Sequence, residues 1–195
     1  MPVKNIDGIF CIVRLELTPE ELPDLLHRHK KNYPGAKDRE KEGKSVIQNG
    51  FKSVQTMQFI ENVCLWGKGD RLIPEFKRNN TPKKVCATLR EAWTSVCSED
   101  VVGAVTQIQT LHQLGQAFAS KVLRFMSPTK AVILDRVIRT HLGYAATPTG
   151  YRDFLADCKN ILEAAQKSGV IDAKFRLKLR VCDIEAAIFA KIQKY

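Results

Sequence analysis

The stretch that decides the fold is GQAFASKVLRFMSPTKAVILD, residues 115–135. Apolar residues recur at helical spacing up to Met126, and the Ser-Pro pair that follows predicts the end of a helix. The wholly apolar run at 131–134 predicts a short, buried, extended segment. Lys121 therefore interrupts an apolar helical pattern, and Asp135 follows a buried run and opens a second helix.

The residues before Lys121 predict a close approach of backbones. Gly115 is expected to adopt the positive φ of a tight turn between two helices. Ala117, Ala119 and Ser120 are small, so a second helix or a phosphate backbone has room to come near. Backbone N–H groups at the start of the next helix would form an anion site, with Ser120 beside it.

Working outward, the periodicity predicts a mainly α protein with many short helices and a small N-terminal strand or hairpin. The strand is expected within 9–17 and the helices over the following ranges: 18–29, 53–66, 83–97, from 101, 111–126 with a break at Gly115 as an alternative, 135–142, 151–168 and a closing helix around 179–192. We expect residues 1–52 to form an N-terminal part, and residues 53–195 to form a helical domain in two lobes.

The segment from His29 to Lys44 is rich in lysine and has almost no apolar content. This composition predicts a long loop or a solvated helix edge. Because acids are interspersed with the lysines, a solvated segment is favoured over a dedicated DNA-binding arm.

Composition limits the class of protein. The formal net charge of +10 over 195 residues favours phosphate backbones or anionic surfaces as partners. The six cysteines are scattered without CxxC spacing, which argues against a zinc site or a disulfide scaffold and predicts buried thiols in a reducing cytoplasm. No apolar run approaches the roughly 18 residues of a membrane-spanning helix, so no membrane association is expected.

Lys121 and Asp135 are the candidates for chemistry, and each has an alternative interpretation. A lysine held among apolar groups loses hydration and becomes a usable nucleophile, although many such lysines merely extend to solvent. An aspartate at this position is a favoured helix N-cap. A carboxylate there would also stabilise an oxocarbenium ion or take a proton, and capping and catalysis are compatible.

Three runs of residues carry a resemblance to a known family: Ala119-Ser120-Lys121-x-Leu123-x-Phe125, Ile133-Leu134-Asp135-x-Val137 and Leu179-Arg180-x-Cys182-Asp183. With Trp66, they resemble the helix-hairpin-helix DNA glycosylase superfamily, in particular its divergent bacterial 8-oxoguanine-glycosylase-like branch. The resemblance covers about Gln55 to Tyr195. The sequence departs from the superfamily pattern at the hairpin, where Phe118-Ala119-Ser120 replaces Gly-hydrophobic-Gly.

The resemblance implies a function and roles for residues. Lys121 would attack C1′ of a flipped nucleotide and Asp135 would assist departure of the base, with AP-lyase activity possible through Lys121. It also implies a helix-hairpin-helix element, an active cleft between the two lobes, and a monomer that acts on double-stranded DNA without a cofactor or a metal.

Further residues are expected at the DNA interface. Arg136 and Arg139 lie on one side of the helix that Asp135 opens, so either would hold a phosphate, with a solvated helix face as the alternative. Trp66, Phe118 and Tyr151 are candidates for the base pocket, although aromatic side chains of helical proteins mostly pack in the core.

Two other functions stay open on the sequence: a non-catalytic basic helical DNA-binding module, and a protein-interaction domain that meets an acidic partner. The excised base is not specified by any residue, and oxidised guanine is suggested only by the resemblance. Base-excision repair and defence against phage DNA with modified bases are both expected roles, and the location would be cytoplasmic and nucleoid-associated.

Overall fold

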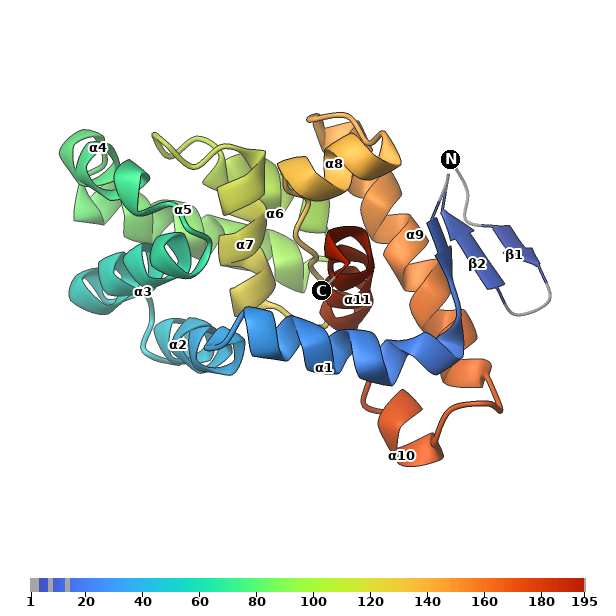
Figure 1. The fold of residues 1–195 in the computed structure, drawn as a ribbon. Helices are drawn as coiled ribbons and strands as arrows, with labels where there is room; N and C mark the ends of the chain where they lie inside the picture. The colour runs from blue at the N-terminus through green and yellow to red at the C-terminus, as the bar shows by residue number, and fades with distance from the viewer. Residues whose placement is uncertain (1–3, 7–8, 13–14, 195) are drawn as a thin grey trace. The chain divides into compact units, whose positions relative to one another are not determined.

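A computed structural model describes residues 4–6, 9–12 and 15–194 of the chain. Within those ranges the protein is mainly helical, as the sequence predicts (Figure 1). The α-helices are α1 (Leu22–Asn32), α2 (Ala36–Gln48), α3 (Ser53–Trp66), α4 (Ile73–Asn79), α5 (Pro82–Cys97), α6 (Val101–Ile108), α7 (Gln116–Met126), α8 (Arg136–Leu142), α9 (Pro148–Lys167), α10 (Ala173–Arg176) and α11 (Val181–Gln193). The strands are β1 (Lys4–Ile6), β2 (Ile9–Ile12) and β3 (Leu15–Leu17), and two short 3-10 helices are η1 (Pro19–Glu21) and η2 (Asp70–Leu72).

The chain divides into two compact units. Unit 1 comprises Met1–Pro34 and Leu134–Tyr195, and unit 2 comprises Gly35–Ile133. The N-terminal part contributes to both, because α1 belongs to unit 1 and α2 to unit 2. The boundaries between the two units lie after Pro34 and after Ile133, and neither coincides with the predicted domain boundary after residue 52.

Unit 1 is built around α11. Nearly every residue of this helix is buried, which is the pattern of a helix that is covered on all sides. Helices α1, α8 and α9 pack against it. The strands form an antiparallel sheet in the order β1-β2-β3, with Cys11 of β2 opposite Lys4 and Glu16. The predicted N-terminal hairpin is thus confirmed as β2 and β3, and β1 adds a strand that was not predicted.

Unit 2 is a helical cluster. Helix α5 packs against α3 and α6, and α7 packs against α2, α3 and α6. Helix α5 covers the predicted range 83–97 and begins one residue earlier, with Pro82 at its first position and Thr81 as N-cap. The Thr81 hydroxyl oxygen accepts a hydrogen bond from the Lys84 N–H at 3.2 Å. The packing buries α7 from Ala119 to Met126.

The basic segment after His29 is helical, so of the two predicted alternatives the solvated helix edge is found and the long loop is not. Helix α1 continues to Asn32, a turn follows in which Gly35 has φ +83°, and α2 begins at Ala36. Lysine, arginine and glutamate are good helix formers, so this composition is compatible with a helix when one side has something to pack against. Gly43 and Val46 provide that buried side, while the lysines of α2 lie on its solvated edge.

Two composition-based expectations are tested by the described residues. The six cysteines are all free thiols, and four of them are buried, but Cys97 is exposed and Cys11 is only half-buried. No helix in the described part of the chain has both the length and the apolar character needed to cross a membrane.

Candidate active-site residues

Lys121 is a buried residue on α7 in unit 2, with only 7% of its surface exposed. Its Nζ lies 5.0 Å from the centre of the Phe118 ring, one helical turn earlier. The ring face is the negative side of the aromatic quadrupole, so it attracts an ammonium group. This burial is one of the two environments that the apolar pattern leaves open for Lys121.

The end of α3 closes around the Lys121 side chain. A Cβ placed on Gly67 would lie 3.0 Å from Lys121 Cδ, and one on Gly69 would lie 2.3 Å from Phe118 Cζ. Both positions therefore need glycine if Phe118 and Lys121 are to keep their places. The sequence has no signal that links Gly67 to Lys121 or Gly69 to Phe118.

Cys64 is a buried thiol whose pKa is affected by the charge of Lys121. Burial and the nearby Glu61 carboxylate raise the pKa of the Cys64 thiol to about 11, and the Lys121 ammonium acts in the opposite direction. Cys64 is thus a neutral thiol at pH 7, and it lies within electrostatic reach of the lysine. Lys121 therefore lies in a poorly hydrated setting, beside the Phe118 ring and the backbone turn after α3.

Helix α2 holds α7 in position. The Arg124 guanidinium of α7 donates a hydrogen bond to Glu40 Oε1 of α2 at 2.8 Å, and the side chains are 5% and 18% exposed. Arg124 also lies 4.6 Å from the centre of the Phe125 ring. At Gly43 the two helices are so close that an added Cβ would meet the Phe125 carbonyl oxygen at 2.4 Å. The sequence predicted no partner for this basic segment, and the structure supplies α7 as one.

The connection between α6 and α7 differs from the predicted turn. Gly115 has φ −61° and ψ 173°, which is extended backbone, and the left-handed residue is Gln113 with φ +70°. The prediction of a positive φ at Gly115 is wrong because the chain reverses two residues earlier. Asn80, a buried residue after α4, fixes that reversal: its side chain donates to the His112 carbonyl at 3.1 Å and accepts from the His112 N–H at 3.0 Å.

Ser120, a predicted DNA contact, is fully buried on α7. Its hydroxyl donates a hydrogen bond to the Ala117 carbonyl oxygen at 3.0 Å. Small side chains at this part of α7 are consistent with close helix packing within unit 2.

Asp135 belongs to unit 1, where it is the N-cap of α8. Its Oδ1 accepts a hydrogen bond from the Ile138 N–H at 3.1 Å, and α8 ends at Gly143 with φ +76°. The preceding residues 131–134 are buried and lack regular secondary structure, while Asp135 itself is half-exposed. The predicted cap and helix are confirmed, and the carboxylate lies at the positive end of a helix, which favours a negative charge.

Arg136 lines a groove of unit 1 with Thr140 and His141 of α8 and the end of α11. The groove has a volume of about 490 Å³. Arg136 is exposed, whereas Arg139 is half-buried, and its Nε has no hydrogen-bond partner among the described residues. A guanidinium, a hydroxyl and an imidazole are groups that bind a phosphate, and His141 was not predicted from the sequence.

The three predicted base-pocket aromatics have different environments. In unit 2, Trp66 is half-buried and meets Phe125 edge-on at 4.8 Å between ring centres, and Phe118 is half-buried against Lys121. In unit 1, Tyr151 is fully buried on α9. The Phe118 ring thus lies against a candidate catalytic residue.

Comparison with known proteins gives one family. A family model described as "Putative 8-oxoguanine DNA glycosylase OGG-like protein" matches residues 42–189. The matched range includes Lys121, Asp135 and most of α2. No curated protein and no solved structure matches the chain.

Proposed function

Because the chain belongs to the 8-oxoguanine DNA glycosylase OGG-like family, which is a family of DNA glycosylases, we propose that it releases a modified base from double-stranded DNA as a monomer. A base inside a duplex is out of reach of side chains, so the target nucleotide would be flipped out of the stack before its N-glycosidic bond is broken. The modified base that we propose first is oxidised guanine, which the family description names.

The observation that carries the proposal is the burial of Lys121 within the family-matched region. Lys121 is 7% exposed, and its Nζ lies 5.0 Å from the centre of the Phe118 ring, so few water molecules surround the amine. A neutral amine is the form that attacks carbon. The ordinary alternative, a lysine that extends into solvent, does not fit this exposure.

The proposed reaction divides the work between two residues. The Lys121 nitrogen forms a bond to C1′ while the bond from C1′ to the base breaks, and the base leaves with the bonding electrons and takes up a proton. Asp135 stabilises the positive charge that develops on the sugar and accepts the proton that the attacking amine loses. Opening of the sugar ring then gives an imine between Lys121 and C1′, from which elimination of the 3′ phosphate would follow.

The exposed groups of α8 support the proposed DNA contact. Arg136, Thr140 and His141 line one groove, and Arg136 directly follows the proposed catalytic aspartate. We propose that this groove holds a phosphate of the strand that carries the target nucleotide. Phosphate contacts position the protein on DNA and carry no sequence information.

The experiment is a screen for base release. Duplex oligonucleotides with oxidised guanine or another modified base, and phage DNA with modified bases, are incubated with the wild-type protein and with Asp135→Asn. We expect abasic sites with one substrate class, and a loss of at least about 100-fold with the variant, the lower end of the effect of an acid–base group. Release from modified phage DNA alone would favour a role in phage defence over repair.

Two results would contradict the proposal. Full activity of Asp135→Asn would remove Asp135 from the reaction. Tight binding to DNA without base release from any substrate would favour the non-catalytic DNA-binding module instead.

A further inference from the structure

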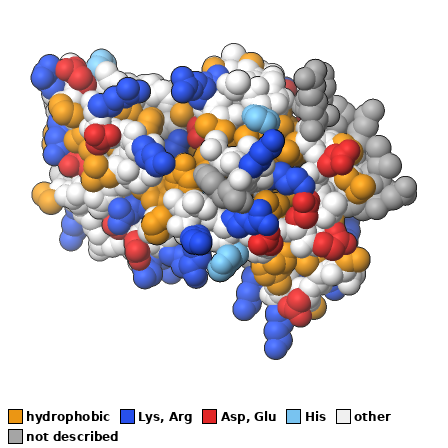
Figure 2. All heavy atoms as spheres, viewed as in Figure 1, with side chains coloured by type: hydrophobic (Ala, Val, Ile, Leu, Met, Phe, Trp, Pro, Cys, Tyr) orange, Lys and Arg blue, Asp and Glu red, His pale blue; other side chains and the backbone are white. Residues whose placement is uncertain are grey.

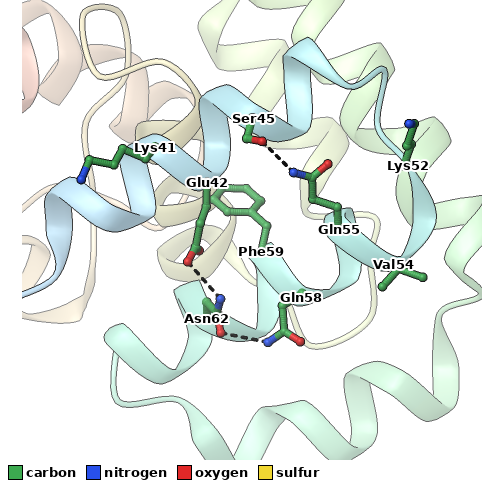
Figure 3. Close-up of a pocket in the computed structure, with 9 residues that line it drawn as sticks. All are labelled: Lys41, Glu42, Ser45, Lys52, Val54, Gln55, Gln58, Phe59 and Asn62. Carbon is green, nitrogen blue, oxygen red and sulfur yellow. Dashed lines mark hydrogen bonds between the residues drawn. The ribbon is translucent and has the colours of Figure 1, made fainter.

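A groove between α2 and α3 in unit 2 lies outside the residues that the proposed reaction uses. It is lined by Lys41, Glu42, Ser45, Lys52, Val54, Gln55, Gln58, Phe59 and Asn62 (Figure 3). Its volume is about 580 Å³, within the range of sites that hold a ligand of nucleotide size. Phe59 is buried and forms an apolar floor, while Val54 is 86% exposed at the rim.

The acidic and basic side chains near this groove differ in their exposure to solvent. Two carboxylates of α2 form ion pairs within unit 2, Glu40 with Arg124 and Glu42 with Arg39, and Glu42 also lines the groove. From residue 36 to residue 52, Asp38 is the one exposed acid, and it pairs loosely with Lys41 at 3.4 Å. The exposed basic residues of the same segment are Lys37, Lys41, Lys44 and Lys52.

This difference in exposure changes the interpretation of the basic segment from His29 to Lys44. Of the acids that lower its net charge, Glu40 is held in the ion pair with Arg124, Glu42 lines the groove and Asp38 is exposed. Three lysines of α2 are exposed beside that one exposed acid, so the solvent-facing side of α2 carries a net positive charge. Figure 2 shows Lys and Arg side chains over α2, with isolated acidic side chains between them. A cationic face of this kind attracts a phosphate backbone.

Hydrogen bonds within the groove hold its neutral polar groups in place. Gln55 donates to Ser45 Oγ at 2.7 Å, and Gln58 donates to Asn62 Oδ1 at 3.0 Å. Asn62 in turn donates to Glu42 Oε1 at 3.1 Å (Figure 3). Amide and hydroxyl groups of this kind make hydrogen bonds to phosphate and sugar oxygens and to base edges.

We infer that the α2–α3 groove is a second DNA-contact site, which binds the phosphate backbone of the substrate away from the target nucleotide. Lys41 and Lys52 contact phosphates at the rim, and the amide groups contact sugar or base atoms. The inference rests on the proposed function for the identity of the substrate. DNA is favoured over an acidic protein partner because the lining combines two lysines, which outnumber the one carboxylate of Glu42, with three amide groups and a hydroxyl group, the groups that contact phosphate and sugar oxygens.

The first test measures how DNA affinity depends on salt. Each phosphate contact contributes about −0.9 to the slope of log K against log salt concentration. We expect Lys41→Gln/Lys52→Gln to make the slope shallower by about 2. The control is Lys159→Gln/Lys174→Gln, which removes two exposed lysines from unit 1 and should leave the slope close to that of wild type.

The second test changes the sign of one charge at the rim. Val54→Asp should weaken binding to an unmodified duplex about threefold or more at low salt, and Val54→Lys should strengthen it. Val170, which is 62% exposed in unit 1, receives the same two substitutions as a matched control. Both valines are exposed, so none of the four variants should unfold.

The outcomes separate this inference from the proposed function. Equal slopes for the two lysine pairs, or equal effects at Val54 and Val170, would overturn the groove as a DNA site. If the groove variants lose affinity but the wild-type protein releases no base from any substrate, the groove stands and the glycosylase proposal fails. If wild type releases a base and the groove variants bind DNA as wild type does, the glycosylase proposal stands and the groove fails.

Discussion

Helices α7 and α8 carry the two candidate catalytic residues, and they are built in different ways. Lys121 lies in the middle of α7, buried by residues from α3 and from the turn after it. Asp135 lies at the start of α8, half-exposed, with a hydrogen bond to a backbone N–H three residues later. The environment of Lys121 is made by tertiary packing, whereas that of Asp135 is made largely by its own helix.

This difference determines what a substitution will disturb. A change near Lys121 acts through neighbours that are distant in sequence, such as Gly43, Gly67 and Glu40. At Asp135 the chemical role and the capping role are separable, because asparagine caps a helix about as well as aspartate does.

The largest expected effect separates the two residues by chemistry. On DNA that already contains an abasic site, borohydride should trap wild type and Asp135→Asn as covalent adducts, because imine formation there requires the amine and no base departure. Lys121→Gln should give no adduct. On DNA with the modified base intact, both variants should lose base release by about 100-fold or more. Gel electrophoresis of the reduced reactions measures the adduct.

One result would break the comparison. If Lys121→Gln still forms a borohydride-reducible adduct, another amine is the nucleophile and the burial of Lys121 serves only the fold. Thermal unfolding of each variant shows whether an inactive protein is still folded.

The second effect concerns the packing that surrounds Lys121. Gly43→Ala places a methyl group against the Phe125 carbonyl oxygen, so α2 and α7 must move apart. We expect a loss of about 1–3 kcal/mol in the free energy of unfolding, as for other overpacked positions. Gly115→Ala is the matched control, since its added Cβ meets nothing within 4 Å. Urea denaturation measures both, and equal stabilities would contradict the tight crossing of α2 and α7.

The same contrast explains how far the sequence predicts the structure. Local signals predict the helix α5 and the helix α8 with Asp135 as its cap, because these depend on periodicity and on hydrogen bonds within a few residues. Local signals fail where the structure depends on contacts between residues that are far apart in the sequence. Helix α2 is polar in sequence and forms against α7, and the left-handed residue of the α6–α7 connection is Gln113, next to the residue that Asn80 binds.

At the candidate site, the sequence indicates the candidate catalytic residues but not the residues that pack around them. The apolar pattern leaves two environments open for Lys121, buried among apolar groups or extended to solvent, and in the structure the residue is buried. Gly67, Gly69 and the Glu40–Arg124 pair have no pattern that links them to α7. Such links are made by side chains brought together from positions far apart in the chain, which periodicity within one helix does not encode.

The third effect isolates the capping role of Asp135. Asp135→Ala should lower the free energy of unfolding by about 1 kcal/mol through loss of the N-cap, and Asp135→Asn should lower it by much less. Both should lose base release. Thermal unfolding of the two variants measures the difference, and equal destabilisation would mean that the charge of Asp135, not its hydrogen bond to Ile138, stabilises α8.

The smallest expected effect concerns Glu21 in unit 1. Its carboxylate accepts hydrogen bonds from the nearby Thr18 N–H and from Lys191, which is distant in sequence. Burial raises the pKa of the Glu21 carboxyl, but hydrogen bonds from Lys191 and the Thr18 backbone, with the Lys191 charge, outweigh it and hold the pKa below its usual value of 4.5. A carboxyl with a lowered pKa stabilises the fold above the pKa of the unfolded chain, and this contribution disappears as the pH falls through the folded value. Glu21→Gln should therefore lower stability at pH 7 by less than about 1 kcal/mol, since the pair is partly exposed. The difference in stability between Glu21→Gln and wild type should close as the pH falls below 4.5.

The control is Glu163→Gln. The hydrogen bond from Lys167 lowers the pKa of this fully exposed carboxyl, and the substitution should have a smaller effect on stability, which added salt removes. A pH-independent loss in Glu21→Gln would show that the contact with α11 stabilises unit 1 by packing and not by charge.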